Sequence, residues 1–280
     1  MPQGADAYEF AEPVDILSQL AKGPVVVGDD SAPFWDCFAS KKWNMRRGAL
    51  DRVRALAAAP RLAPGDYGEV ARELKKVLAK DANVTCAAAA ADAAAALAGG
   101  LRREFAAAAR QLCPAVLERF REKNSIMSKA ADEALRAMAT HCYSLGEVVD
   151  EYVAALAHKN PKVRLDTLRL LRDVLAGADK AQAARARDAL LPAVAKLAPD
   201  ADAGIREAAA GALVAYALKM GSYGAIQPVS GCRNPRRPTE LGPMLAPSLF
   251  RARVDTHHSL MLLFCPRSTW PSWTTSGASS

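Results

Sequence analysis

The sequence predicts an all-α fold, an α-solenoid of stacked helical pairs, and three observations predict it. Apolar residues recur in steps of four, as at Met45, Ala49 and Val53, which keeps their side chains on one helix face. A polar helix-to-helix turn precedes such an apolar stripe five times along the chain. These turns return about every 40 residues, which is the period of HEAT or armadillo-like helical repeats.

The first turn lies in SKKWNMRRGALDRV (Ser40–Val53) and places Trp43 at the bend. The later turns are KDANV (Lys80–Val84), EKNSIM (Glu122–Met127), HKNPKVR (His158–Arg164) and DADAGIR (Asp200–Arg206). The first apolar position after each turn is aligned as Met45, Val84, Ile126, Val163 and Ile205, with steps of 39, 42, 37 and 42 residues. We therefore expect each of these positions to begin the buried stripe of a helix.

Local signals set the expected helix boundaries. Before the first turn, Ala11–Leu17 is predicted as a short helix and Lys22–Pro33 as a loop. The paired helices are expected at Phe34–Lys42, Asn44–Ala58, Tyr67–Ala79, Asn83–Ala98, Leu101–Phe120, Ser125–Thr140, Ser144–Ala157, Lys162–Ala176, Ala181–Ala198 and Ala203–Met220. Gly99-Gly100 is expected to end a helix, and Pro114 to bend one. Asn160-Pro161 supplies an N-cap followed by proline at the first helical position.

The composition changes after Gly221. Residues 221–280 contain no lysine, hold seven of the 17 prolines and are rich in serine and threonine. This predicts a disordered tail that does not continue the repeats. Its apolar run Ser259–Cys265 is too short to cross a bilayer.

Charge and motifs exclude several function classes. The formal net charge is +7, but the tail contributes +4 of it and leaves the body a mixed surface, which argues against nucleic-acid binding. The six cysteines form no CxxC pair, so we expect reduced, buried thiols of an intracellular protein and neither metal nor cofactor. No signal peptide, long apolar run or catalytic motif is found, so membrane insertion and enzymatic activity are not expected.

The turns are the better candidate for a functional site. In a solenoid of helical pairs, successive turns align along one edge, which for five turns measures roughly 30–40 Å. That length suits the face of a folded protein. Tryptophan and arginine dominate the energetics of protein interfaces, and cations accelerate encounter with an acidic partner. Two interpretations of Trp43 remain open: an exposed anchor for a partner, or a side chain packed against the neighbouring pair.

Four segments carry a resemblance to a known family. They are EFAEPVDIL (Glu9–Leu17), FWDCFASKKWNMRRGAL (Phe34–Leu50), LAPGDYGEVARELKKVLAKDANV (Leu62–Val84) and HKNPKVRLDTLRLL (His158–Leu171). In this order they resemble a TOG domain over residues 8–220, most similar to the second TOG domain of the ch-TOG / Mini spindles / Stu / Dis microtubule polymerases. The resemblance implies a stack of about six HEAT repeats.

The resemblance also implies a partner and a site. TOG domains bind the αβ-tubulin dimer through their intra-repeat turns and act at the microtubule plus end, which implies a non-enzymatic protein of the cytoplasm, spindle and centrosome. The implied tubulin-binding residues are Lys41, Lys42, Trp43, Lys80, Asn83, Val84, Lys123, Asn124, Lys159, Asn160, Lys162 and Arg206. The alternative is a generic HEAT-repeat scaffold that binds another protein through the same edge.

This chain departs from the family pattern in two places within the body. The segment Lys22–Pro33 is longer than the family's, and the fifth turn carries no lysine, which leaves Arg206 as its cation. Arg164 and Arg206 fit a structural role, beside acidic residues of the next repeat, as well as they fit a binding role.

Overall fold

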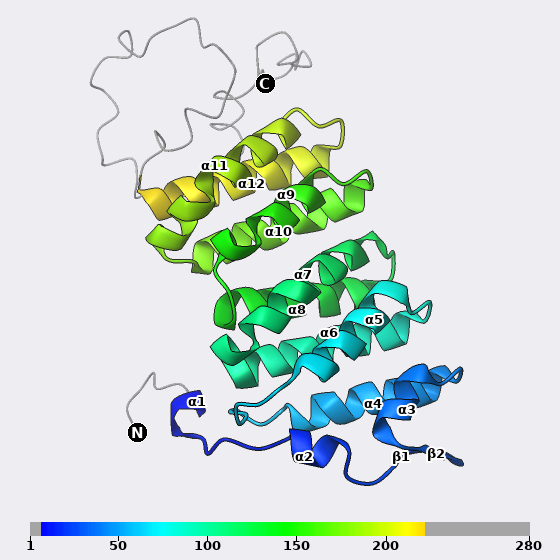
Figure 1. Ribbon diagram of the computed structural model, residues 1–280. Helices are drawn as coiled ribbons and strands as arrows, with labels where there is room; N and C mark the ends of the chain where they lie inside the picture. The colour runs from blue at the N-terminus through cyan, green and yellow to red at the C-terminus, as the bar shows by residue number, and fades with distance from the viewer. Residues whose placement is uncertain (1–6, 222–280) are drawn as a thin grey trace, which may run out of the picture. The chain divides into compact units, whose positions relative to one another are not determined.

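The computed structural model describes residues 7–221 and shows an α-solenoid of five helical pairs (Figure 1). The first helices of the pairs are α3 (Phe34–Ala39), α5 (Gly68–Lys80), α7 (Ala106–Glu118), α9 (Val149–Leu156) and α11 (Lys180–Leu197). The second helices are α4 (Trp43–Leu56), α6 (Val84–Leu101), α8 (Ser125–His141), α10 (Pro161–Gly177) and α12 (Ala203–Met220). The all-α solenoid expected from the sequence is confirmed. The tail predicted after Gly221 lies outside the described residues.

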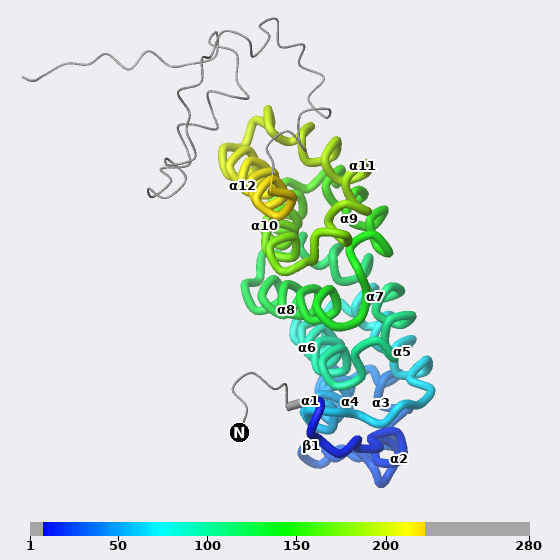
Figure 2. Tube along the Cα trace, turned by 90° about the vertical axis from the view of Figure 1, so that its left-hand side faces the viewer, coloured from blue at the N-terminus to red at the C-terminus, as the bar shows by residue number. Residues whose placement is uncertain are grey.

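The helices form two layers. Figure 2 shows the first helices in one layer and the second helices in the other. Along the second layer α4 packs on α6, α6 on α8, and α10 on α12. The five intra-pair turns consist of residues 40–42, 81–83, 122–124, 157–160 and 198–202. We number them turns 1 to 5; they lie on one side of the solenoid, at the right in Figure 1, and form what we call the turn edge.

The segment before α3 differs from its prediction. Ala11–Leu17 is not a helix: α1 (Ala7–Phe10) precedes it, and α2 (Leu17–Leu20) begins only at its last residue. Instead, Val14 bridges Leu62 in parallel, and the backbone N–H of Ala63 donates to the Val14 carbonyl at 2.9 Å. This pairing holds the segment extended. The predicted loop contains an antiparallel hairpin of β1 (Val25–Val27) and β2 (Asp30–Ala32).

Glycine and proline signals misplaced two helix boundaries. Helix α6 continues through Gly99-Gly100 to Leu101, and the chain leaves it at Arg102, where φ is 50°. A Cβ at position 100 would lie 2.6 Å from Cγ of Leu62, so Gly100 permits close packing rather than stopping the helix. Helix α7 runs through Pro114; the break comes earlier, in the 3-10 turn Arg102–Phe105. Two further 3-10 turns, Arg119–Arg121 and Leu145–Val148, follow α7 and precede α9.

The true repeat register is counted from the N-cap residue of each second helix. The third residue after every N-cap is buried, and these positions are Met45, Cys86, Met127, Val163 and Ile205. The sequence alignment is therefore wrong at turns 2 and 3. At turn 3 it placed Ile126 in the core, but Ile126 is 65% exposed and Met127 takes the buried position.

Alanine makes α6 the most enclosed helix of the second layer. Its residues Ala87–Ala91 are all buried between the neighbouring helices α4 and α8. By length and composition, the stretch Val84–Arg121 could cross a membrane, although the sequence analysis found no such run. In the solenoid, however, 67% of its most apolar window is buried, as in the core helix of a soluble protein. Composition alone therefore overstates its affinity for lipid.

Four of the six cysteines lie in the described residues, and all four are free and buried, as predicted. Burial raises the pKa of the Cys113 and Cys142 thiols to about 12. A thiol reacts as its thiolate, so these two groups are unreactive at neutral pH. They contribute to the core as small apolar side chains.

Polar contacts connect the successive turns. Arg46 donates two hydrogen bonds to Asp81, at 2.7 and 2.9 Å, and another to the Ser40 carbonyl, which joins turn 1 to turn 2. Arg119, which is 4% exposed, donates to the carbonyls of Val77, Leu78 and Asp81 and so holds turn 2 from the α7 side. The spacing of the edge is therefore fixed by charged hydrogen bonds as well as by apolar packing.

The same arrangement recurs further along the edge. Lys162 Nζ donates to the Phe120 carbonyl at 3.1 Å and to Ser128 Oγ at 2.7 Å, which joins turn 4 to the third pair. Arg164 pairs with Asp200 at 3.2 Å and also donates to the His158 carbonyl, which joins turn 5 to turn 4. The structural role considered for Arg164 is the one that the structure shows.

Replacing Asp81 with asparagine should lower stability, because the nearly buried Arg46 and Arg119 would lose a negative neighbour. We expect Asp81→Asn to cost about 2 kcal/mol or more of unfolding free energy at pH 7. Burial alone would raise the pKa of the Asp81 carboxyl, but hydrogen bonds from Arg46 and the Asn83 N–H outweigh it and lower the pKa below its usual range. A lowered folded-state pKa stabilises above the unfolded pKa and loses that effect as the pH falls, so the difference between wild type and variant should shrink below about pH 4.

Urea unfolding at pH 7 and pH 3 measures both effects. The matched control is Asp188→Asn, whose side chain is 98% exposed. Equal losses in the two variants at pH 7 would contradict a stabilising role for the Arg46–Asp81 pair.

Candidate functional site

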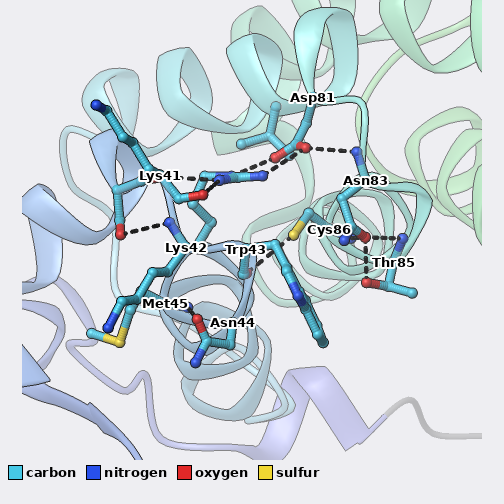
Figure 3. Close-up of polar contacts among 12 residues, drawn as sticks. Lys41, Lys42, Trp43, Asn44, Met45, Asp81, Asn83, Thr85 and Cys86 are labelled. Carbon is cyan, nitrogen blue, oxygen red and sulfur yellow. Dashed lines mark hydrogen bonds and ion pairs between the residues drawn. The ribbon is translucent and has the colours of Figure 1, made fainter. Parts of the chain in front are cut away.

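Trp43 is the first residue of α4 and stands on the turn edge with 51% of its surface exposed. Its backbone is fixed locally: the Lys42 N–H donates to Ser40 Oγ at 3.2 Å, and Cys86 Sγ donates to the Trp43 carbonyl at 3.3 Å. Figure 3 shows these contacts, with the indole ring extending away from them. Of the two interpretations left open by the sequence, the structure supports an exposed indole at the end of the edge.

Four lysines give the edge its exposed positive charge. Lys41, Lys123 and Lys159 each stand immediately before the N-cap of a second helix, and Lys80 is the last residue of α5. All four are exposed, and within residues 7–221 none of their ammonium groups contacts a carboxylate. Turns 1, 3 and 4 thus each hold one of these solvated ammonium groups, and Lys80 places another directly before turn 2. Turn 5 presents none, as the sequence indicated.

The other predicted cations are engaged within the protein. Lys42 pairs with Asp30 at 2.6 Å. Lys162 contacts Asp166 at 2.7 Å in addition to its bonds to the third pair. Arg206 Nη1 donates to the carbonyls of Asp200 and Ala201, each at 2.8 Å, which closes its own turn. These three residues shape the edge, and their charge is less available to a partner than that of the four lysines.

The predicted asparagines are helix N-caps. Asn83 Oδ1 accepts from the N–H groups of Thr85 and Cys86, and Asn124 Oδ1 accepts from those of Ile126 and Met127. Asn160 Oδ1 accepts from the Lys162 N–H at 2.9 Å. An N-cap to alanine change typically costs about 1 kcal/mol. The asparagines therefore set where the second helices begin, and hence where the edge residues stand.

Two apolar side chains accompany Trp43 on the edge. Val84 occupies in α6 the first helical position that Trp43 occupies in α4, and it is partly buried against the core. Ile126, at the second position of α8, is 65% exposed and was missed as a site residue because it was assigned to the core. Counting from Asn124 would have found it, since the third position after each N-cap is the buried one.

A pocket lies between turns 1 and 2. It has a volume of about 580 Å³ and is lined by Trp43, Phe38 and Val77 on its apolar part and by Lys76 and Lys80 among its charged residues. It could receive a side chain or a loop of a partner beside the indole. A second cavity of about 430 Å³ lies between the ends of α8 and α10, where Arg136 is already paired with Asp132 and Asp173.

Comparison with known proteins places the chain in a family. Residues 32–224 match the sequence model of the family described as CLASP N terminal. Protein MOR1 of Arabidopsis thaliana is 34% identical over 221 residues, which is 79% of this chain and 11% of that protein. Protein mini spindles of Drosophila melanogaster is 34% identical over 163 residues, or 58% of this chain and 7% of that protein. The chain thus spans only about a tenth of the length of these relatives.

Solved structures agree in fold. One, reported for microtubule plus-end tracking by XMAP215, CLIP-170 and EB1, has a TM-score of 0.71 and 29% identity and covers 82% of this chain and 92% of its own. Another, reported for tubulin recruitment and assembly by microtubule polymerases with TOG domain arrays, has a TM-score of 0.68 and 27% identity and covers 80% of this chain and 45% of its own.

The match over residues 32–224 covers more than half of the chain, and the first of these solved structures covers 82% of it. The second-domain assignment made from the sequence stays a prediction. The chain belongs to the CLASP N terminal family and is a TOG domain of the XMAP215/ch-TOG type.

Proposed function

We propose that the turn edge binds the αβ-tubulin dimer and that the chain acts as a non-enzymatic, tubulin-binding module of a microtubule plus-end regulator. The observation that carries the proposal is the exposed Trp43 at one end of a row of four solvated lysines. The similarity to proteins of microtubules, spindles and centrosomes supports this partner over that of a generic scaffold. It also supports a location on cytoplasmic microtubules.

Physical chemistry assigns different roles to the two kinds of residue. The backbone of Trp43 is fixed at the start of α4, where Cys86 Sγ donates to its carbonyl, so little backbone freedom is lost on binding. A tryptophan in such a position typically contributes about 2 kcal/mol or more to an interface. The lysines remain solvated and contribute chiefly to the rate of encounter with an acidic partner. Arg46, Lys162 and Arg164 keep the contact points at fixed separations.

Trp43→Ala should abolish or strongly weaken the complex, because truncation removes the anchor without removing a core contact. A loss of about 2 kcal/mol corresponds to roughly a 30-fold weaker affinity. The measurement is co-elution of the protein with tubulin on a sizing column, with the dissociation constant from titration. The control is Phe10→Ala, which removes a side chain that is 72% exposed but lies off the edge, on α1. Unchanged binding by Trp43→Ala would remove the indole from the site, and no complex with the wild type would refute the proposal.

Charge reversal should act mainly on the association rate. We expect Lys123→Glu with Lys159→Glu to slow association with tubulin by about tenfold or more at low salt, and the deficit should diminish at high salt because the Debye length shortens. Stopped-flow association at two ionic strengths measures this. Lys180→Glu is the control: this exposed lysine begins α11, at the end of that helix remote from turn 5. Because Lys180→Glu changes the net charge by half as much, an effect half as large as that of the double variant would attribute the change to net charge rather than to the edge.

A further inference from the structure

The hairpin of β1 and β2 lies beside turn 1 and continues the turn edge past Trp43. Asp30, the first residue of β2, pairs with Lys42 at 2.6 Å, and Lys42 directly precedes Trp43. Figure 1 shows the hairpin on the same side of the solenoid as the five turns. The segment that the sequence analysis predicted to be longer than the family's therefore stands next to the proposed anchor.

The hairpin is held against α4 along its length. A Cβ at Gly48 would lie 2.6 Å from Cγ2 of Val27 and 3.0 Å from Cγ1 of Val25, so this glycine creates the space that the two valines fill. Arg52 donates to the carbonyls of Gln19, Lys22 and Gly23 and fixes the chain that leads into β1. Gly28, with φ of 62°, provides the left-handed residue of a tight hairpin turn. Together these contacts make the hairpin a docked element of the solenoid.

Alternation along β1 then determines which side chain faces outward. Val25 is 6% exposed and Val27 is partly buried, and both face α4. Val26 lies between them, opposite Ser31, and is 64% exposed. Val25 and Val27 pack against α4, but nothing in the described part of the chain covers Val26. A β-branched apolar side chain held rigidly in water is suited to contact a partner at low entropic cost.

We propose that Val26 on the β1–β2 hairpin is a further contact residue for the tubulin dimer, so that the binding edge has six contact elements rather than five. The proposal rests on the tubulin-binding function proposed above. It commits to tubulin because the hairpin is joined to turn 1 by the Lys42–Asp30 pair, so a folded protein seated on Trp43 would reach it. The hairpin would add a contact beside turn 1. Turn 5, at the opposite end of the edge, holds no lysine.

The test places a photo-crosslinking benzophenone amino acid at position 26, 43 or 218 in the full chain, mixed with tubulin. Position 218 is the control, since Leu218 is 58% exposed but lies near the C-terminal end of α12, remote from turn 5. We expect tubulin adducts from positions 26 and 43 and none from 218. Adducts from 43 without any from 26 would overturn the hairpin proposal and leave the tubulin proposal intact. A wild-type protein that forms no tubulin complex would overturn both.

Substitution of Val26 measures how much its side chain contributes to the affinity for tubulin. Val26→Ser should weaken tubulin binding about three- to tenfold, and Leu218→Ser, which removes a similarly exposed side chain, should change it less than about twofold. Circular dichroism melts of both variants check that folding is retained, as expected for exposed positions. An unchanged dissociation constant for Val26→Ser, in a protein whose Trp43→Ala variant binds poorly, would exclude Val26 from the interface.

Discussion

The bidentate ion pair of Arg46 and Asp81 is the contact on which the geometry of the edge depends. Arg46 reaches back to the Ser40 carbonyl and forward to Asp81, while Arg119 holds the backbone of Asp81 from the other side. Turns 1 and 2 are thereby held at a set distance from each other, and Trp43 directly follows turn 1. In a protein of stacked pairs, each pair contacts only its neighbours, so local ties of this kind decide how accurately distant turns align. The Arg164–Asp200 pair repeats the arrangement between turns 4 and 5.

The structure separates two populations of charge that look alike in the sequence. Lysine and arginine follow or precede most turns, and the sequence offered no means to tell a cation used within the protein from one left in solvent. The distinction depends on whether the residue lies inside a second helix, where its side chain can extend back to the carbonyls of the turn, or in the turn itself. Arg206 and Lys162, two positions or more inside a second helix, fold back onto carbonyls, whereas Lys123 and Lys159, in the turn itself, extend into water.

Periodicity predicted the fold class and most of the paired helices, because the apolar stripes are strong and the caps Asn83, Asn124 and Asn160 lie in the sequence where the helices begin. It failed where tertiary contacts override local signals. Gly100 was taken as a helix stop, yet it accommodates Leu62. Ile126 was assigned to the core because an apolar residue after a turn was assumed to be buried. The hairpin was missed since its strands are only three residues each and depend on α4 for their packing.

The alanines of α6 have a consequence for the dimensions of the molecule. The distance between packed helices depends on the size of the side chains between them, within about 8–10 Å. With Ala87–Ala91 buried, α6 packs on α4 and α8 across small side chains, which favours the short end of that range for the first three pairs. The volume of buried side chains thus sets the spacing of the turns on the surface. A bulkier residue at one of these alanines would lengthen the repeat and put Trp43 out of step with the turns that follow, although the residue itself never meets a partner.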